Sequence, residues 1–247
     1  MKLENNTVLV TGGTSGIGLA LAVRFLKSGS KVVICGRDNE RLKAVQAQYP
    51  KMHIICCNVA DEAQRLTLFN TVIQEFPEIN IVVNNAGIQK RINLKNVAWK
   101  DCKQELATNI EAPIHLSTLF APHLLNKENA FIINVSSGLA FVPPIWAPIY
   151  GATKAGLHSF TFCLREQLTD TGIGVIEIIP PAVNTNLGGA GMHTFGVDVD
   201  DFADSIFEGF ADGSTEIGFQ GNLETRNKSR MELESMAAGM YKRIAQS

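Results

Sequence analysis

The sequence has no long hydrophobic run: nowhere do roughly 18 apolar residues follow one another, which excludes a membrane-spanning helix. It has no charge bias either, because 22 basic and 24 acidic side chains leave a formal net charge of −2. This balance excludes the strongly basic surface that binds nucleic acid. The opening residues 1–6 are also too polar to begin a secretory signal.

Cysteine is scarce, at five residues, and no two cysteines have the C-x-x-C spacing of a zinc or redox site. We expect all five thiols to be reduced and buried as small hydrophobic groups in a cytoplasmic protein. Cys56 and Cys57 are neighbours in a predicted strand and should point to opposite faces. The five histidines show no metal-ligand spacing, so we expect no metal site.

Short β-branched runs alternate with helical stretches along the whole chain. The predicted strands are 7–11, 31–35, 53–57, 79–83, 131–135, 175–179 and 216–219. The predicted helices are 16–28, 38–48, 61–75, 149–169 and 201–211, with two more between 96 and 125 that Pro113 separates by a bend or a restart. Such apolar strands between helices are typical of a parallel sheet. We therefore predict an α/β fold, a doubly wound Rossmann-type parallel sheet with helices on both faces.

No linker divides the chain, and we expect residues 1–247 to form a single domain. The segment around 186–200 is rich in glycine and poor in helix-forming residues, as a flexible flap over a site or a plain surface loop would be. The tail from Asn222 favours helix, and its methionines, at 231, 236 and 240, are spaced like a packing face. A core or subunit contact is the expected role of that face.

A glycine-rich stretch, residues 11–18 (TGGTSGIG), lies between the first predicted strand and the first helix. Glycines at such a turn let the backbone approach a pyrophosphate, and the helix N-terminus offers free N–H groups and a positive dipole to phosphate. This position in a doubly wound sheet indicates a dinucleotide site. Its expected cofactor-binding residues are Thr11, Gly12, Thr14, Ser15, Gly16, Ile17 and Gly18.

A second pattern consists of Ser137, Tyr150 and Lys154. Tyr150 and Lys154 are four residues apart and share one face of a predicted helix, and Ser137 follows the fifth strand, at the edge where open α/β sheets hold ligands. A free phenol has a pKa of about 10, and we expect the lysine ammonium to lower the pKa of Tyr150 toward neutrality. Tyr150 could then exchange a proton with a carbonyl or alcohol, while Ser137 holds the substrate oxygen.

The glycine loop and the Ser-Tyr-Lys pattern, together with Asn84-Asn85-Ala86-Gly87, resemble the short-chain dehydrogenase/reductase family, and more narrowly its DltE-like oxidoreductase branch. The resemblance implies a catalytic tetrad of Asn109, Ser137, Tyr150 and Lys154. In that tetrad Asn109 holds a water and Lys154 also binds the nicotinamide ribose. It further implies cofactor contacts from Asn58, Val59, Asn85, Ala86, Gly87, Tyr150, Lys154, Pro180, Val183 and Thr185.

Two positions depart from the family pattern. Pro181 replaces the glycine that usually follows Pro180, which removes an N–H beside the expected nicotinamide site. Asn58 replaces the aspartate usually found beside the adenine, and its side chain can still accept a hydrogen bond.

Cofactor preference depends on the end of the second strand, where glycine stands in place of the acidic residue that binds the ribose of NAD. Arg37 follows and can pair with a 2′-phosphate, which favours NADP(H) over NAD(H). Asp38 leaves the NAD alternative open, because it could cap the next helix or contact the ribose.

The sequence thus predicts an NADPH-dependent oxidoreductase, a carbonyl reductase or alcohol dehydrogenase, that acts on a small molecule. An NAD-dependent dehydrogenase and a non-catalytic NADP(H)-binding sensor or scaffold are the alternatives. His193, Trp146 and Phe141 are weaker candidates for substrate contact. The family resemblance also implies a homodimer or homotetramer formed through helices 107–126 and 149–169.

Overall fold

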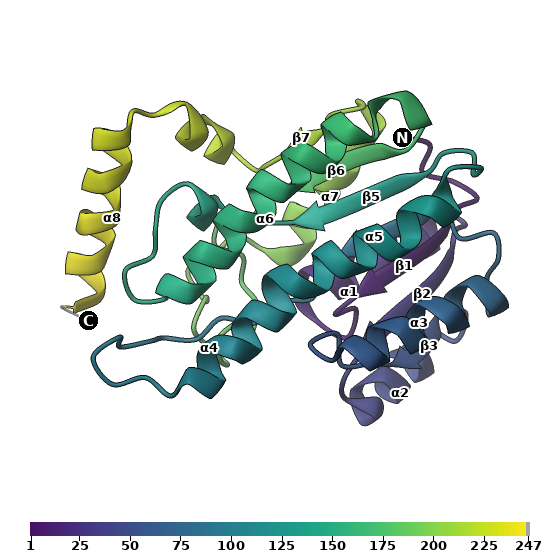
Figure 1. The fold of residues 1–247 in the computed structure, drawn as a ribbon, viewed down its shortest axis with the longest axis horizontal. Coiled ribbons are helices and arrows are strands. Elements are labelled where there is room, and N and C mark those ends of the chain that lie inside the picture. Colours follow the sequence, from purple (N-terminus) through teal and green to yellow (C-terminus); the bar gives the residue numbers. More distant parts are fainter. Residues whose placement is uncertain (246–247) are drawn as a thin grey trace.

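The computed structural model describes residues 1–245 and arranges them around one parallel sheet (Figure 1). The strands run in the order β3-β2-β1-β4-β5-β6-β7. They are β1 (Thr7–Thr11), β2 (Lys31–Gly36), β3 (His53–Cys56), β4 (Ile81–Asn84), β5 (Phe131–Val135), β6 (Gly174–Ile178) and β7 (Glu216–Ile217). All pairs are parallel, which confirms the predicted doubly wound sheet.

Eight α-helices connect and cover the strands in the described part of the chain. They are α1 (Gly16–Lys27), α2 (Asn39–Gln48), α3 (Glu62–Glu75), α4 (Trp99–Leu106), α5 (Ala112–Leu124), α6 (Pro148–Gln167), α7 (Val199–Ala211) and α8 (Arg230–Ala245). In Figure 1, α5 and α6 lie in front of the sheet, and α1 and α7 lie behind it. None of these helices is long and apolar enough to cross a bilayer.

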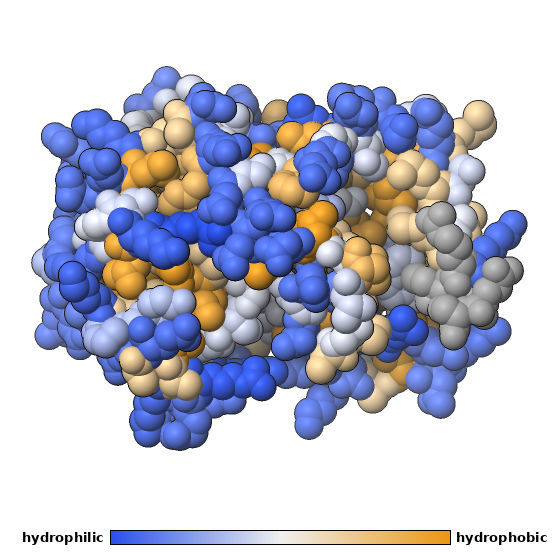
Figure 2. Space-filling view, turned by 180° about the vertical axis from the view of Figure 1, so that it is seen from behind, coloured by the Kyte–Doolittle hydropathy of each residue, from blue (hydrophilic) through white to orange (hydrophobic). Residues whose placement is uncertain are grey.

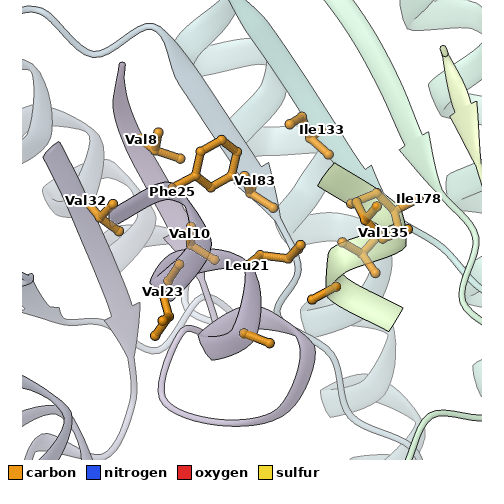
Figure 3. Close-up of a cluster of buried hydrophobic side chains, with 14 of the residues drawn as sticks. Val8, Val10, Leu21, Val23, Phe25, Val32, Val83, Ile133, Val135 and Ile178 are labelled. Carbon is orange, nitrogen blue, oxygen red and sulfur yellow. The ribbon is translucent and has the colours of Figure 1, made fainter. Parts of the chain in front are cut away.

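The sheet buries both of its faces because successive side chains alternate between them. Val8 and Val10 belong to the core on the α1 side, whereas Leu9 belongs to the core on the α5 side. Figure 3 shows Leu21 and Phe25 of α1 packed over the strands of the first core. All five side chains are fully buried, so the sheet is a rigid support for the loops at its edge.

The helix that follows β4 is continuous through Pro113 but changes its hydrogen-bond pattern. Residues 107–111 form a π-helical stretch in which the Ala112 N–H donates to the carbonyl of Ala107, five residues back. Pro113 has no N–H to donate to the carbonyl of Asn109, so the regular pattern is interrupted there. The expected bend or restart is thus a π-helical stretch joining α4 to α5.

The carboxyl ends of the strands point toward α8, as the arrow of β5 shows (Figure 1). From behind, the molecule is mostly hydrophilic, with hydrophobic residues visible in the hollows between polar ones (Figure 2). Strand order reverses between β1 and β4, which lie side by side and lead in opposite directions across the sheet. In open α/β sheets, ligands bind at such a reversal, outside the carboxyl ends of the strands.

Candidate functional site

A cleft of about 1040 Å³ opens at this edge of the sheet. It is bordered by the loops after β1, β2, β4, β5 and β6, and also by the segment after residue 185 and by α8. Most of the predicted site residues line it, namely Gly12, Thr14, Ser15, Gly16, Ile17, Gly18, Arg37, Asn58, Val59, Asn85, Ala86, Gly87, Ser137, Tyr150, Lys154, Pro180, Val183 and Thr185.

The glycine loop has the backbone shape that a phosphate cradle needs. Gly12 and Gly16 have positive φ angles, of +66° and +55°, which side chains rarely allow. A Cβ on Gly18 would lie 2.3 Å from Nδ2 of Asn85. Gly12 and Gly18 are therefore packed against the segment after β4 with no room for a side chain, and α1 starts at Gly16. A pyrophosphate fits this cradle, since it can meet free backbone N–H groups at the start of α1.

Thr11 does not line the cleft, contrary to the expectation that it contacts the cofactor. Its side chain is buried, and Oγ1 accepts hydrogen bonds from the N–H groups of Asn85 and Ala86, at 2.9 and 3.0 Å. Asn85 in turn donates from Nδ2 to the carbonyl of Thr11, at 2.8 Å. Because Thr11 ends β1 and points between the strands, it joins the β1 and β4 loops from beneath instead of facing a ligand.

Arg37 and Asp38 follow β2 and line one end of the cleft. Asp38 caps α2, since its Oδ1 accepts the N–H groups of Glu40 and Arg41, each at 3.1 Å. Its Oδ2 lies 3.3 Å from Nε of Arg41. The carboxylate of Asp38 is thus already engaged by its own helix, and Arg41 adds a second guanidinium to this end of the cleft.

Ser137, Tyr150 and Lys154 meet at the centre of the cleft. Ser137 lies two residues past β5, and Tyr150 and Lys154 are one turn apart on α6; all three are nearly fully buried. The Ser137 hydroxyl hydrogen-bonds the Tyr150 phenol, and Nζ of Lys154 lies 5.7 Å from the centre of its ring. Lys154 donates to the carbonyl of Val135 at 2.7 Å, which holds the ammonium at the end of β5.

The expected lowering of the Tyr150 pKa is wrong for this cleft. Burial raises the pKa of Tyr150 to about 12, and the hydrogen bond with Ser137 offsets this only in part. Burial also lowers the pKa of Lys154 to about 8, against the opposing charge of Glu177. Desolvation disfavours the charged form of each group and is the largest cause of both shifts. At neutral pH the phenol is therefore protonated, as a general acid requires.

Asn109 lies in the π-helical stretch, fully buried behind the cleft instead of lining it. Its Nδ2 donates to the carbonyl of Ile88 at 2.7 Å, and its Oδ1 accepts the Ile88 N–H at 2.9 Å. Nδ2 also reaches the hydroxyl of Thr153 on α6, at 3.3 Å. Asn109 thus ties the segment after β4 to the helix that carries Tyr150.

Comparison with known proteins agrees with this geometry. The short chain dehydrogenase family model matches residues 6–193. The chain is also 45% identical over 224 residues to DltE of Bacillus subtilis, an uncharacterized oxidoreductase. The aligned region covers 88% of this chain and 89% of that protein. This chain belongs to the short-chain dehydrogenase/reductase family. The resemblance inferred from its motifs is confirmed.

Solved structures extend the likeness of this short-chain dehydrogenase to its fold. A short-chain dehydrogenase from Sphingobium yanoikuyae in complex with NADPH superimposes with a TM-score of 0.82, at 25% identity, over 93% of this chain and 95% of that one. A 3-ketoacyl-(acyl-carrier-protein) reductase from Brucella melitensis complexed with NADH gives 0.81, at 26% identity, over 89% and 98%. The two neighbours hold different nicotinamide cofactors.

The segment expected to be a flap lies over the cleft of this short-chain dehydrogenase. It is held at its base by the bridge between Val183 and Val197, and Nε2 of His193 lies 3.2 Å from Oε1 of Gln89. Leu187, His193 and Phe195 line the cleft, whereas α7 already begins at Val199, inside the range given to the flap. Trp146 also lines the cleft, but Phe141 packs edge-on against His158 instead.

Sequence reasoning missed part of the lining of this short-chain dehydrogenase. Gln104 reaches the cleft from α4, and Met236 and Met240 reach it from α8. The spacing of the methionines was visible in the sequence, but it gave no indication that α8 turns back over the strand ends. Gln104 belongs to no motif, because its role depends on the path of the chain between β4 and α4. Gln89 and Lys90 also line the cleft, within the segment 88–96 that the sequence predicts to frame it.

The expectation of uniformly buried thiols is wrong for Cys56 and Cys163, which are exposed. Cys56 and Cys57 do point to opposite faces, one exposed and one buried, as strand geometry predicts. Cys163 lies on the outward face of α6, where the core does not reach. In the described residues, no group of three or more His, Cys, Asp or Glu side chains is placed to hold a metal ion.

Proposed function

We propose that this protein is an NADPH-dependent carbonyl reductase that acts reversibly as an alcohol dehydrogenase on a small-molecule substrate. The observation that carries the proposal is the buried contact of Ser137, Tyr150 and Lys154 beside a glycine cradle of dinucleotide size. A phenol that remains protonated at neutral pH suits reduction, because a carbonyl that receives a hydride must also receive a proton.

In this proposal the chain's own residues orient the substrate and hold the proton. A bound nicotinamide cofactor supplies or accepts the hydride. The glycine loop, Asn85–Gly87 and Val183–Thr185 hold the cofactor against the sheet edge. Ser137 and Tyr150 both direct hydroxyls at the substrate oxygen, and the Tyr150 proton goes to that oxygen as negative charge develops on it. Lys154 binds α6 to the end of β5 through the Val135 carbonyl, and Asn109 binds α6 through the hydroxyl of Thr153, so both hold the helix that carries the phenol in place.

A preference for NADP(H) is supported by the two guanidiniums and by the engaged carboxylate at the adenosine end. A 2′-phosphate would meet Arg37 and Arg41, and Asp38 is held by its own helix N-terminus. Purified protein titrated by nicotinamide fluorescence should bind NADPH at least tenfold more tightly than NADH. Arg37→Ala should remove most of that difference by weakening NADPH alone, since a phosphate–guanidinium pair contributes roughly 1.5–3 kcal/mol.

Lys43→Ala is the matched control for Arg37→Ala: it removes an exposed cation of α2 that does not line the cleft. It should leave both affinities unchanged. Equal affinity for the two cofactors, or tighter NADH, would favour the NAD-dependent alternative and leave the proposed catalytic residues untouched.

A non-catalytic NADP(H)-binding sensor is the second candidate function. It would bind cofactor in the same cleft but would have no use for a buried lysine, whose burial is costly. Incubation of cofactor-saturated protein with a panel of aldehydes and ketones discriminates the two. Cofactor oxidation that Tyr150→Phe abolishes supports the reductase, and binding without oxidation supports the sensor.

We also propose a homodimer or homotetramer built on α5 and α6. Phe162 of α6 is 55% exposed and Leu125, at the end of α5, is 48% exposed, so apolar side chains face outward from both helices. Sedimentation at micromolar protein should show two or four chains, and Phe162→Glu should weaken the assembly at least tenfold. Leu66→Glu, at a similarly exposed leucine of α3, is the control. A monomeric wild type would contradict the proposal.

The five unpaired cysteines support a reducing compartment, and we propose the cytoplasm on that basis.

A further inference from the structure

Glu105 is a buried carboxylate beside the cleft that the reaction scheme above does not use. It lies on α4 with no exposed surface. Its Oε1 accepts the backbone N–H of Lys90 at 3.2 Å, and its Oε2 has no hydrogen-bond partner among the described residues. Burying a carboxylate oxygen without a partner is costly, so its retention needs a reason.

The position of Glu105 suggests that reason. Asn109, one turn further along the same helix, binds both the N–H and the carbonyl of Ile88. Glu105 and Asn109 together therefore hold the backbone of residues 88–90 against the helix. The side chains of Gln89 and Lys90 in this stretch line the cleft, and Gln89 also contacts His193 of the segment that covers it.

Two charged or titratable groups face Glu105 from the elements packed against it. Lys90 approaches from the segment after β4, and its ammonium is itself bound to Asp101 and Gln104, at 2.7 and 2.9 Å. Tyr150 approaches from α6, which packs on α4, and the negative charge of Glu105 raises the pKa of its phenol. Burial raises the pKa of Glu105 to about 7, against the N–H and the charge of Lys90.

We propose that Glu105 is a positioning residue of the catalytic centre: its buried carboxylate holds the substrate-lining backbone of residues 88–90 in place beside the cleft. The inference rests on the proposed reductase function, in which Tyr150 is the acid. The negative charge of the same carboxylate also favours the protonated form of the Tyr150 phenol, in addition to the larger effect of burial. Above neutral pH Glu105 is charged and opposes ionisation of Tyr150, and this extends the pH range over which the acid form persists.

Two substitutions separate the two effects. Glu105→Gln keeps an oxygen that accepts the Lys90 N–H and removes the charge, whereas Glu105→Leu removes both. Tyrosinate absorbance of the NADP+-bound protein, taken as the difference from the same protein carrying Tyr150→Phe, reports the ionisation of Tyr150 without turnover. The chain has only three tyrosines, so this difference is measurable. The kcat and KM for reduction of 4-nitrobenzaldehyde are measured in parallel.

Glu105→Gln should move the onset of Tyr150 ionisation, and the alkaline limb of kcat, to lower pH by about half a unit or more, with KM changed less than about threefold. Glu105→Leu should show the same shift and a KM raised about tenfold, because the Lys90 N–H loses its acceptor. Glu111→Gln, at an exposed glutamate further along the helix, should leave both unchanged.

An unshifted Tyr150 titration in Glu105→Gln would overturn the electrostatic role, and an unchanged KM in Glu105→Leu would overturn the role in holding residues 88–90. Circular dichroism and the NADPH affinity confirm that each variant is folded. If the wild type reduces no carbonyl compound, the proposed function fails, while the absorbance titration still decides whether Glu105 controls Tyr150.

Discussion

Tyr150→Phe is expected to reduce kcat for carbonyl reduction about 10³-fold or more while leaving the affinity for NADPH within about twofold. The substitution removes one hydroxyl from a fully enclosed ring and leaves the shape of the cleft intact. When the carbonyl carbon accepts the hydride, the carbonyl oxygen would then gain negative charge with no proton donor, and the barrier would rise accordingly.

The measurement is single-turnover cofactor oxidation at saturating aldehyde, with nicotinamide fluorescence for binding. Tyr49→Phe is the matched control, because Tyr49 follows α2 and does not line the cleft. A Tyr150→Phe variant that kept more than about a tenth of the wild-type kcat would show that another group delivers the proton.

The sheet could be predicted because its sequence pattern is local. Buried parallel strands such as β1 and β5 appear as short apolar runs bounded by polar or glycine residues, and Asp38 and Asp61 mark helix starts through capping oxygens. Errors occurred where long-range packing decides. The sequence showed that Pro113 would interrupt a helix, but not that a π-helical stretch would carry the helix across the interruption, with Asn109 of that stretch bound to Ile88.

The candidate site was predictable in its motifs but not in its energetics. Spacing along α6 brought Tyr150 and Lys154 to one face, and the order of the strands placed Ser137 beside them. The direction of the Tyr150 pKa was misjudged, because the cost of burial depends on the covering segments and not on the spacing. Glu105 was missed for the same reason, since its importance comes from full burial next to a segment with no regular structure.

Burial acts on the two central groups in opposite senses, and both effects suit reduction. Burial keeps the Tyr150 phenol protonated and lowers the pKa of the Lys154 ammonium to about 8. At neutral pH the site therefore holds a neutral acid and an ammonium that gives up its proton more readily than an ordinary lysine. The buried ammonium of Lys154 serves the reaction, but burying it lowers the stability of the fold. Lys154 is where this cost can be measured.

Lys154→Met is expected to abolish most turnover and, at pH 7, to raise the stability of the fold. Methionine has a similar length and no charge, so kcat should fall about 10²-fold or more as the cation near the phenol and the expected ribose contact are lost. The stability gain follows from the pKa of Lys154, which burial lowers from 10.5 to about 8. At about 1.4 kcal/mol per pKa unit, burying the ammonium costs roughly 3 kcal/mol below pH 8.

The net gain should be smaller, about 1–2 kcal/mol, because the carbonyl of Val135 loses its donor. In the variant the carboxylate of Glu177 still contacts Nδ1 of His158, at 2.9 Å, so loss of the Lys154 ammonium does not leave it without a partner. Urea unfolding at pH 7 measures this gain. Arg24→Met, which removes a largely buried cation that is paired with two exposed carboxylates, is the control and should not stabilise.

The pH dependence tests the cause of the gain. Between about pH 8 and 10.5 the unfolded chain binds more protons at Lys154 than the folded protein does, so wild-type stability rises with pH relative to the variant. Tyr150 does not interfere below about pH 10, because its phenol is protonated in both states there. The advantage of Lys154→Met should therefore be largest below pH 8 and shrink by pH 10. A variant that is less stable than wild type at pH 7 would show that burial of the Lys154 ammonium does not destabilise the fold. A stability advantage that does not change with pH would show that the charge of Lys154 is not its cause.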